Sequence, residues 1–153
     1  MMLIRKLSPD ETPPWELLVL ADPSRMIVEG YIKSSCIYVG EISGVIMAVY
    51  VVKETSKIVV EIMNVAVHED YQGKGLGKQL ISHAINEASN QGYAQLEIGT
   101  GNSSIHQLKL YQQCGFRIVG VDFDYFTRSY DEPIYENGLL CQDMIRLCYT
   151  FEN

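Results

Sequence analysis

The sequence is poor in positive charge and lacks the patterns that hold nucleic acid or metal. Its 153 residues include 12 Lys and Arg against 19 Asp and Glu, which gives a net charge of −7. Without a basic patch, we expect no nucleic-acid partner, whereas an acidic protein suits a cationic amine. The four cysteines (Cys36, Cys114, Cys141 and Cys148) form no C-x-x-C pair, and the three histidines are scattered. The sequence therefore predicts no metal site and no disulfide framework.

Long apolar runs are also absent. No stretch reaches the length of a membrane span, and the opening MMLIRKLSPDETPP has no apolar region of the kind found in signal peptides. We therefore expect a cytoplasmic protein with no membrane partner. Internal repeats and linker-like segments are missing too, and the length suits one hydrophobic core. The expectation is a single domain over residues 1–153.

Hydrophobic periodicity switches several times between strand and helix. Apolar runs and alternation predict strands at residues 2–7, 36–41, 45–52, 58–67, 94–100, 116–121 and 140–151. Helical spacing and capping residues predict helices at residues 15–21, 22–30, 76–90 and 105–113. Residues 122–138 are rich in aromatics and acids and show no regular period, so we expect an irregular loop there. This order of elements predicts one α/β domain.

A glycine-rich loop joins the most apolar strand to the longest helix. It reads Gln72-Gly73-Lys74-Gly75-Leu76-Gly77 and follows the run from Val59 to Val67. Glycines leave backbone N–H groups uncovered, and a helix N-terminus adds the positive end of its dipole, so the loop suits a pyrophosphate. The P-loop pattern does not fit, nor does the G-x-G-x-x-G pattern of dinucleotide-binding proteins. A dinucleotide-binding function is therefore disfavoured.

The loop satisfies the pattern Q/R-x-x-G-x-G/A and resembles the acetyl-CoA signature of the GCN5-related N-acetyltransferases (GNAT). A second segment, Leu110 to Phe116 (LYQQCGF), matches the LYxxxGF segment that ends the last helix in that family. The resemblance covers residues 2–121 and, more loosely, the final strand. It implies an α/β (α+β) fold with a mixed, mostly antiparallel sheet flanked by helices. It also implies that this sheet splays open at the cofactor cleft, between the strands that end at Val67 and Thr100.

The resemblance assigns most cofactor contacts to the backbone. Main-chain groups would bond the pantetheine arm and polarise the acetyl carbonyl at Asn64, Val65, Ala66 and Val67. Backbone N–H groups would hold the pyrophosphate at Gln72, Gly73, Lys74, Gly75, Leu76 and Gly77. One position departs from the family, which often places an Asn seven residues before the Tyr of LYxxxGF. Ser104 stands there in this sequence, so either Ser104 or the nearby Asn102 would make that cofactor contact.

Two side chains match the positions of catalytic groups in the family. Tyr111 would protonate the departing thiolate of coenzyme A, and Glu61 would take a proton from the amine, directly or through a water. The alternatives are a Tyr111 ring that only packs the helix and a Glu61 that faces solvent. For the acceptor, the sequence offers aromatics among acids in the segment before the last strand and four residues near the N-terminus. These are Asp122, Phe123, Asp124, Tyr125, Phe126, Tyr130, Glu132, Tyr135 and Glu136, together with Trp15, Arg25, Met26 and Tyr31.

The resemblance therefore predicts acetyl transfer from acetyl-CoA to a primary amine of a small molecule or peptide. The amine would attack directly in a ternary complex, and no metal would take part. The alternative is a non-catalytic module that senses acyl-CoA through the same cleft, for which Tyr111 and Glu61 would be unnecessary. A homodimer is left open.

Overall fold

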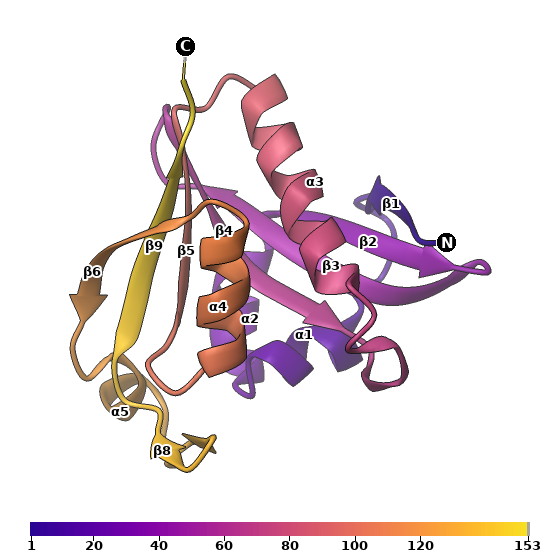
Figure 1. The fold of residues 1–153 in the computed structure, drawn as a ribbon. Helices are drawn as coiled ribbons and strands as arrows, with labels where there is room; N and C mark the ends of the chain where they lie inside the picture. The colour runs from indigo at the N-terminus through magenta and orange to yellow at the C-terminus, as the bar shows by residue number, and fades with distance from the viewer. Residues whose placement is uncertain (153) are drawn as a thin grey trace.

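The structure is a computed structural model and describes residues 1–152. It consists of a seven-stranded sheet with helices on both faces, and a small hairpin beside it (Figure 1). The strands of the sheet are β1 (Leu3–Lys6), β2 (Cys36–Ile42), β3 (Val45–Glu54), β4 (Val59–Val67), β5 (Gln95–Gly101), β6 (Arg117–Asp122) and β9 (Met144–Thr150). The helices are α1 (Trp15–Ala21), α2 (Arg25–Ile32), α3 (Leu76–Asn90), α4 (Ile105–Gln113), α5 (Tyr125–Ser129) and the 3₁₀ turn η1 (Glu69–Tyr71).

The sheet has the order β1-β2-β3-β4-β5-β9-β6, and only β4 and β5 run parallel. These two strands pair from Val59–Ile62 to Gln95–Ile98 and then diverge. The rest of β4 stays paired with β3 alone, so its edge toward β5 lacks a strand partner within the described chain. The two halves of the sheet separate toward the bottom of Figure 1. The predicted splayed, mostly antiparallel sheet is thus confirmed.

Helices cover the two faces of the sheet and bury two separate cores. On one face, the apolar stripe of α3 (Leu80, Ile81, Ala84) packs with β4 and β5, and α4 lies beside it. On the other face, Leu18 of α1 and Val28 of α2 are fully buried against β3 and β4. The alternating burial along β4 shows how one strand serves both cores. No helix among residues 1–152 is long and apolar enough to cross a membrane.

The C-terminal third differs from the sequence prediction in two places. The segment 122–138 is not wholly irregular, because it forms α5 and the first strand of a hairpin, β7 (Tyr135–Glu136) with β8 (Leu139–Leu140). The last strand begins at Met144 instead of residue 140. The reason is that Asn102 Oδ1 accepts hydrogen bonds from the backbone N–H groups of residues 142 and 143 at 2.9 and 3.0 Å. Those donors are therefore unavailable to a strand ladder.

Candidate active site

The glycine loop has the backbone geometry of an anion cradle. Gly73 and Gly75 have φ of 77° and 81°, a left-handed conformation that costs other residues about 1–2 kcal/mol. Gly75 is the N-cap of α3, and no side chain in the described chain caps that helix by a hydrogen bond. The first N–H groups of α3 therefore remain free for an anion. Gln72 holds the loop against β4, since its Nε2 donates to the carbonyl of Val67 at 2.9 Å.

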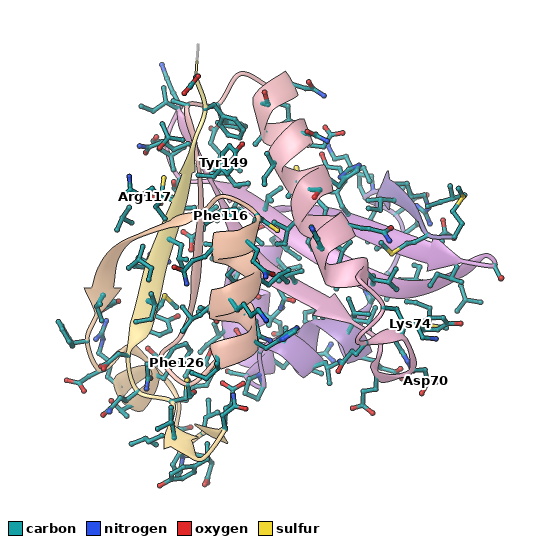
Figure 2. All side chains as sticks on the ribbon, viewed as in Figure 1. Asp70, Lys74, Phe116, Arg117, Phe126 and Tyr149 are labelled. Carbon is teal, nitrogen blue, oxygen red and sulfur yellow. The ribbon has the colours of Figure 1, made fainter. Side chains whose placement is uncertain are left out.

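A groove of about 420 Å³ runs from this loop along the free edge of β4 to α4. Most of the predicted cofactor residues line it: Val65, Ala66, Val67, Gln72, Gly73, Gly75, Leu76 and Gly77. Lys74 is not among the residues that line it; its Nζ lies 5.2 Å from the ring centroid of Tyr71, on the loop where Figure 2 labels it. At one end of the groove, backbone groups of β4 have no strand partner in the described chain. At the other end, the first N–H groups of α3 are free. Together they offer hydrogen bonds to an extended amide chain that ends in phosphates.

Tyr111 lies where the groove meets a second, larger cavity. The side chain lines both spaces and is 3% exposed. Burial raises the pKa of its phenol above the ordinary value, so the hydroxyl keeps its proton at neutral pH. The phenol has no hydrogen-bond partner within residues 1–152, whereas the ring packs against Phe116 with centroids 6.2 Å apart. Tyr111 thus combines a packing role with a hydroxyl proton available for donation.

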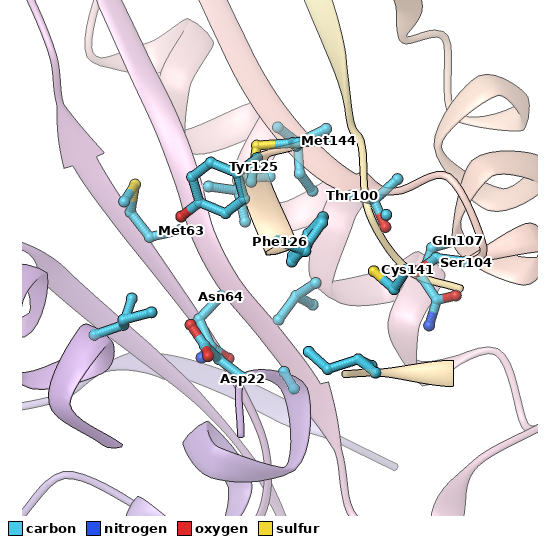
Figure 3. A pocket seen from close by; sticks show the side chains of 18 of the residues that line it. Asp22, Met63, Asn64, Thr100, Ser104, Gln107, Tyr125, Phe126, Cys141 and Met144 are labelled. Atoms are coloured by element: carbon cyan, nitrogen blue, oxygen red, sulfur yellow. The ribbon is translucent and has the colours of Figure 1, made fainter. Parts of the chain in front are cut away.

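The second cavity measures about 650 Å³ and opens on the other side of the splayed strands. Figure 3 shows its walls, with Asp22 and Asn64 on one side, Ser104 and Gln107 on the other, and Phe126 between them. Aromatic and apolar walls with a few polar groups are typical of small-molecule sites. The lining includes four carboxylates, Asp22, Glu61, Asp122 and Glu136, but a single basic residue, Arg146. The cavity therefore favours cationic over anionic ligands.

Glu61 lies in this cavity and is not simply directed to solvent. Its Oε2 accepts a hydrogen bond from Arg146 Nη1 at 3.0 Å, and Glu97 Oε1 lies 3.6 Å from Arg146 Nη2. The side chain of Glu61 is 18% exposed. A carboxylate in an apolar strand is costly unless it is paired, and Arg146 supplies that pairing. Glu61 Oε1 has no hydrogen-bond partner in the part of the chain that the structure describes, so it is free to accept a proton.

Comparison with known proteins agrees with this geometry. The model of the acetyltransferase (GNAT) family matches residues 3–116. The uncharacterized N-acetyltransferase YvbK of Bacillus subtilis is 52% identical over 133 residues, which cover 87% of this chain and 86% of that protein. The chain belongs to the GNAT acetyltransferase family. It is accordingly an enzyme, an N-acetyltransferase, as the two sequence segments predicted, and the sensor alternative is disfavoured.

Two solved GNAT structures match almost the whole chain. The IAA acetyltransferase from Bacillus cereus is 48% identical, with a TM-score of 0.95 over 99% of this chain and 100% of that one. A GNAT acetyltransferase from Elizabethkingia anophelis is 40% identical, with a TM-score of 0.96 over 98% of both chains, and has acetyl-CoA bound. That relative therefore shows that this fold can hold acetyl-CoA.

Besides Lys74, three of the predicted cofactor residues lie outside the described lining of the groove in this GNAT chain. Asn64 turns its side chain toward α1 and lines the second cavity instead. Ser104 also lines that cavity, and its hydroxyl donates to Glu136 Oε1 at 3.0 Å. Asn102 lines neither space, because its amide bonds the backbone of residues 140, 142 and 143. The side chain of Asn102 therefore already has a structural role.

Two basic residues of the groove were missed by the sequence analysis. Lys78 and His106 both line it, in the first turns of α3 and α4. A cation in the first turn of a helix opposes the helix dipole. Lys78, directly after a glycine loop, could therefore have been recognised as a partner for a bound phosphate. Within residues 1–152, no three His, Cys, Asp or Glu side chains are grouped as they would be around a metal.

The predicted acceptor residues divide into two groups. Those that line the cavity are Tyr31, Asp122, Tyr125, Phe126, Tyr130 and Glu136. Those outside its described lining are Trp15, Arg25, Met26, Phe123, Asp124, Glu132 and Tyr135. Arg25 stacks over the ring of Trp15 at 4.0 Å, which gives both of these residues a local role. Asp22 and Arg146 were missed, because neither belongs to a motif and only the fold brings them to this cavity.

Proposed function

We propose that this N-acetyltransferase transfers the acetyl group of acetyl-CoA to a primary amine of a small molecule or peptide, by direct attack in a ternary complex. The observation that carries the proposal is the position of Tyr111 at the junction of two spaces. One space suits the cofactor, and the other is large enough for an acceptor. Because the two spaces meet at one buried hydroxyl, amine and thioester can react without an acetylated enzyme residue.

In this reaction the amine nitrogen attacks the thioester carbon, and the C–S bond then breaks. Negative charge develops first on the carbonyl oxygen. Backbone N–H groups at the unpaired edge of β4, beyond Ile62, are fixed donors for that oxygen. Such a donor contributes about 3–4 kcal/mol to transition-state stabilisation in other acyl-transfer enzymes. The splay of the sheet is therefore the feature that makes the backbone of β4 available for catalysis.

Two protons move during the transfer. One must leave the ammonium form of the acceptor, and we assign its removal to Glu61 Oε1, directly or through a water, while Arg146 holds Oε2 in place. The other must reach the sulfur of the departing coenzyme A, and we assign it to the phenol of Tyr111. Burial raises the pKa of Tyr111, so the phenol keeps its proton at neutral pH and can donate a hydrogen bond to the departing sulfur as the C–S bond breaks.

Steady-state kinetics test the proposal. The purified enzyme is supplied with acetyl-CoA and a panel of primary amines, and release of the CoA thiol is followed. We expect turnover with at least one amine and intersecting initial-velocity lines when both substrates are varied. Parallel lines would indicate an acetylated enzyme and would contradict the ternary complex. Tight binding of acetyl-CoA without turnover of any amine would revive the sensor alternative.

Two expectations from the sequence remain predictions. A cytoplasmic location can be checked by fractionation of cells that express the protein. A homodimer can be checked by sedimentation of the purified protein at several concentrations. Neither bears on the chemistry proposed for Tyr111 and Glu61, because both side chains lie in spaces lined by this one chain.

A further inference from the structure

Asp22 is a carboxylate in the acceptor cavity that lacks a cationic partner. It follows α1 and lines the cavity wall. Its Oδ1 accepts hydrogen bonds from the Tyr130 hydroxyl at 2.8 Å and from the Ser24 N–H at 3.1 Å. Its Oδ2 has no hydrogen-bond partner, and no Lys, Arg or His among residues 1–152 lies within 4.0 Å of either oxygen. One oxygen is therefore anchored, while the other is free.

Asn64 presents a second free acceptor in the same cavity. Asn64 is 5% exposed. Its Nδ2 donates to the Leu18 carbonyl at 3.0 Å and to the Tyr31 hydroxyl at 3.1 Å. Because a backbone carbonyl only accepts, the amide nitrogen must face Leu18, and this fixes the orientation of the amide. Asn64 Oδ1 is then left buried without a partner in the described chain. An unsatisfied buried acceptor costs about 1–3 kcal/mol, so its retention points to a donor from a ligand.

Three tyrosines surround these acceptors. Tyr31 of α2, Tyr125 of α5 and Tyr130 after α5 all line the cavity. Burial raises the pKa of each phenol, and the nearby charge of Asp22 acts in the same direction on all three, so the rings are neutral at physiological pH. Neutral rings that line the same cavity as a carboxylate can add cation–π attraction for a bound cation. Arg146, the one basic residue in the cavity lining that residues 1–152 provide, is already paired with Glu61 and Glu97.

We propose that Asp22, Asn64 Oδ1 and the tyrosines 31, 125 and 130 form a subsite that binds the ammonium nitrogen of the acceptor. The inference rests on the proposed function and gives it a substrate class. A primary ammonium brings both a charge for Asp22 and N–H donors for Asn64 Oδ1. A quaternary ammonium would satisfy only the charge, and a neutral alcohol only the donor requirement. Acceptors with a carboxylate beside the amine would be repelled by Asp22.

Binding of three probes with one carbon skeleton tests this subsite: phenethylamine, its N,N,N-trimethyl derivative and 2-phenylethanol. Titration calorimetry is done on the complex with CoA, which cannot donate an acetyl group, so binding is measured without turnover. We expect the wild type to prefer phenethylamine to both other probes by roughly tenfold or more. Asp22→Asn should lose that preference over the alcohol, since Asn keeps the bonds to Tyr130 and Ser24 but lacks the charge.

Asp131→Asn is the matched control. It removes the same charge one residue beyond Tyr130, from an exposed side chain that lies outside the described lining of the cavity. It should bind phenethylamine as the wild type does. Tyr130→Phe removes one of the two bonds that position Asp22 and should weaken amine binding by a few-fold, less than Asp22→Asn. Equal losses in Asp22→Asn and Asp131→Asn would reduce the effect to overall charge and overturn the subsite.

The outcomes separate this subsite from the proposed function. If the wild type acetylates amines but Asp22→Asn leaves their KM unchanged, the subsite is wrong and the function stands. If phenethylamine binds through Asp22 but no amine is acetylated, the function is wrong and the subsite stands. If the wild type fails to bind phenethylamine, or binds 2-phenylethanol equally well, the subsite is overturned.

Discussion

The cofactor groove and the acceptor cavity meet at Tyr111 but are built in opposite ways. The groove is formed mainly by one continuous stretch, residues 65–78, completed by α4, and its glycine loop offers backbone N–H groups at the start of α3. The cavity draws on the α1–α2 junction, β4, β5, α5 and residues 134–146, and its lining includes the charged side chains of Asp22, Glu61, Asp122, Glu136 and Arg146. One site therefore depends on backbone conformation, whereas the other depends on charges that only the fold assembles.

This difference predicts different sensitivities. In the groove, a substitution acts mainly when it changes φ or fills the space over a backbone N–H. In the cavity, a substitution that removes one charge or hydroxyl changes the ligand preference without disturbing the fold. The following experiments test that contrast, beginning with the largest effect.

Gly75→Val should abolish acetyl-CoA binding. The φ of 81° at this position is unfavourable for a β-branched residue, so the loop must rearrange and its N–H groups lose their common direction. A Cβ at Gly75 would meet no atom within 4 Å, so conformational strain, not a clash, is the expected cause. The measurement is the rise in melting temperature caused by acetyl-CoA, which we expect in the wild type and not in this variant.

Gly44→Val provides the matched control for that experiment. Gly44 has nearly the same φ, 80°, and equally open space, but it lies in the turn between β2 and β3, outside the groove lining. Both variants should lose about 1–2 kcal/mol of stability, and only Gly75→Val should lose the response to acetyl-CoA. A response that survives in Gly75→Val would place the pyrophosphate site elsewhere.

Tyr111→Phe tests the junction of the two spaces. The change removes one hydroxyl and keeps the ring that packs against Phe116, so the fold and the Kd of acetyl-CoA should stay close to wild type. If the phenol protonates the leaving thiolate, kcat should fall roughly 10²-fold or more. Calorimetry measures the Kd of acetyl-CoA, and steady-state release of the CoA thiol measures kcat. An unchanged kcat would leave water as the proton donor.

The groove could be predicted from the sequence because its geometry is local. A strand, a glycine loop and a helix follow one another in the chain, and glycine at positions 73 and 75 permits the left-handed backbone that the loop adopts. Even the splay of the sheet followed from the family resemblance. Lys78 lies just after the motif and lines the groove, whereas the lysine inside the motif, Lys74, lies over the ring of Tyr71 and is not among the lining residues.

The cavity could be predicted only in part, since its members are distant in sequence. Asp22 and Tyr130 are 108 residues apart and form one hydrogen bond. Neither the turn after α1 nor the position of α5 is specified by a short pattern. Aromatic and acidic composition did indicate Tyr125, Phe126 and Tyr130, which line the cavity. The same composition could not distinguish them from Phe123 and Tyr135, which are 69% and 68% exposed.

Glu61→Gln tests the assigned base in the cavity. Gln can still accept the hydrogen bond from Arg146, so the strand should remain intact. Turnover should fall roughly tenfold or more at a pH where the amine is protonated, and the defect should shrink once free amine is abundant. Glu97→Gln removes a carboxylate from the other side of Arg146 and does not line the cavity, so it should leave the pH profile unchanged. A loss independent of pH would make Glu61 a structural residue.

The smallest effect concerns the stability of the protein without ligands. Burial raises the pKa of Asp22, although its bonds to Tyr130 and Ser24 partly offset that effect. An Asp in the unfolded chain titrates near pH ~4. As pH rises from there through the folded-state pKa, the unfolded state has already lost its proton, so the free energy of unfolding falls and then levels off. The charged Asp22, faced by Tyr31, Tyr125 and Tyr130 and by no cation in the described chain, thus lowers stability at neutral pH.

Asp22→Asn should remove that penalty. Below pH ~4 the variant and the wild type should melt alike, and above it the variant should gain a few degrees at most, since about 1 kcal/mol shifts Tm by roughly 2–4 °C in a domain of this size. Asp131→Asn, exposed and outside the cavity lining, should show no such pH-dependent gain. Differential scanning calorimetry across this range gives the comparison. A variant that is more stable yet binds amine less well would show that Asp22 is retained for the ligand, whereas a less stable variant would make its carboxylate part of the scaffold.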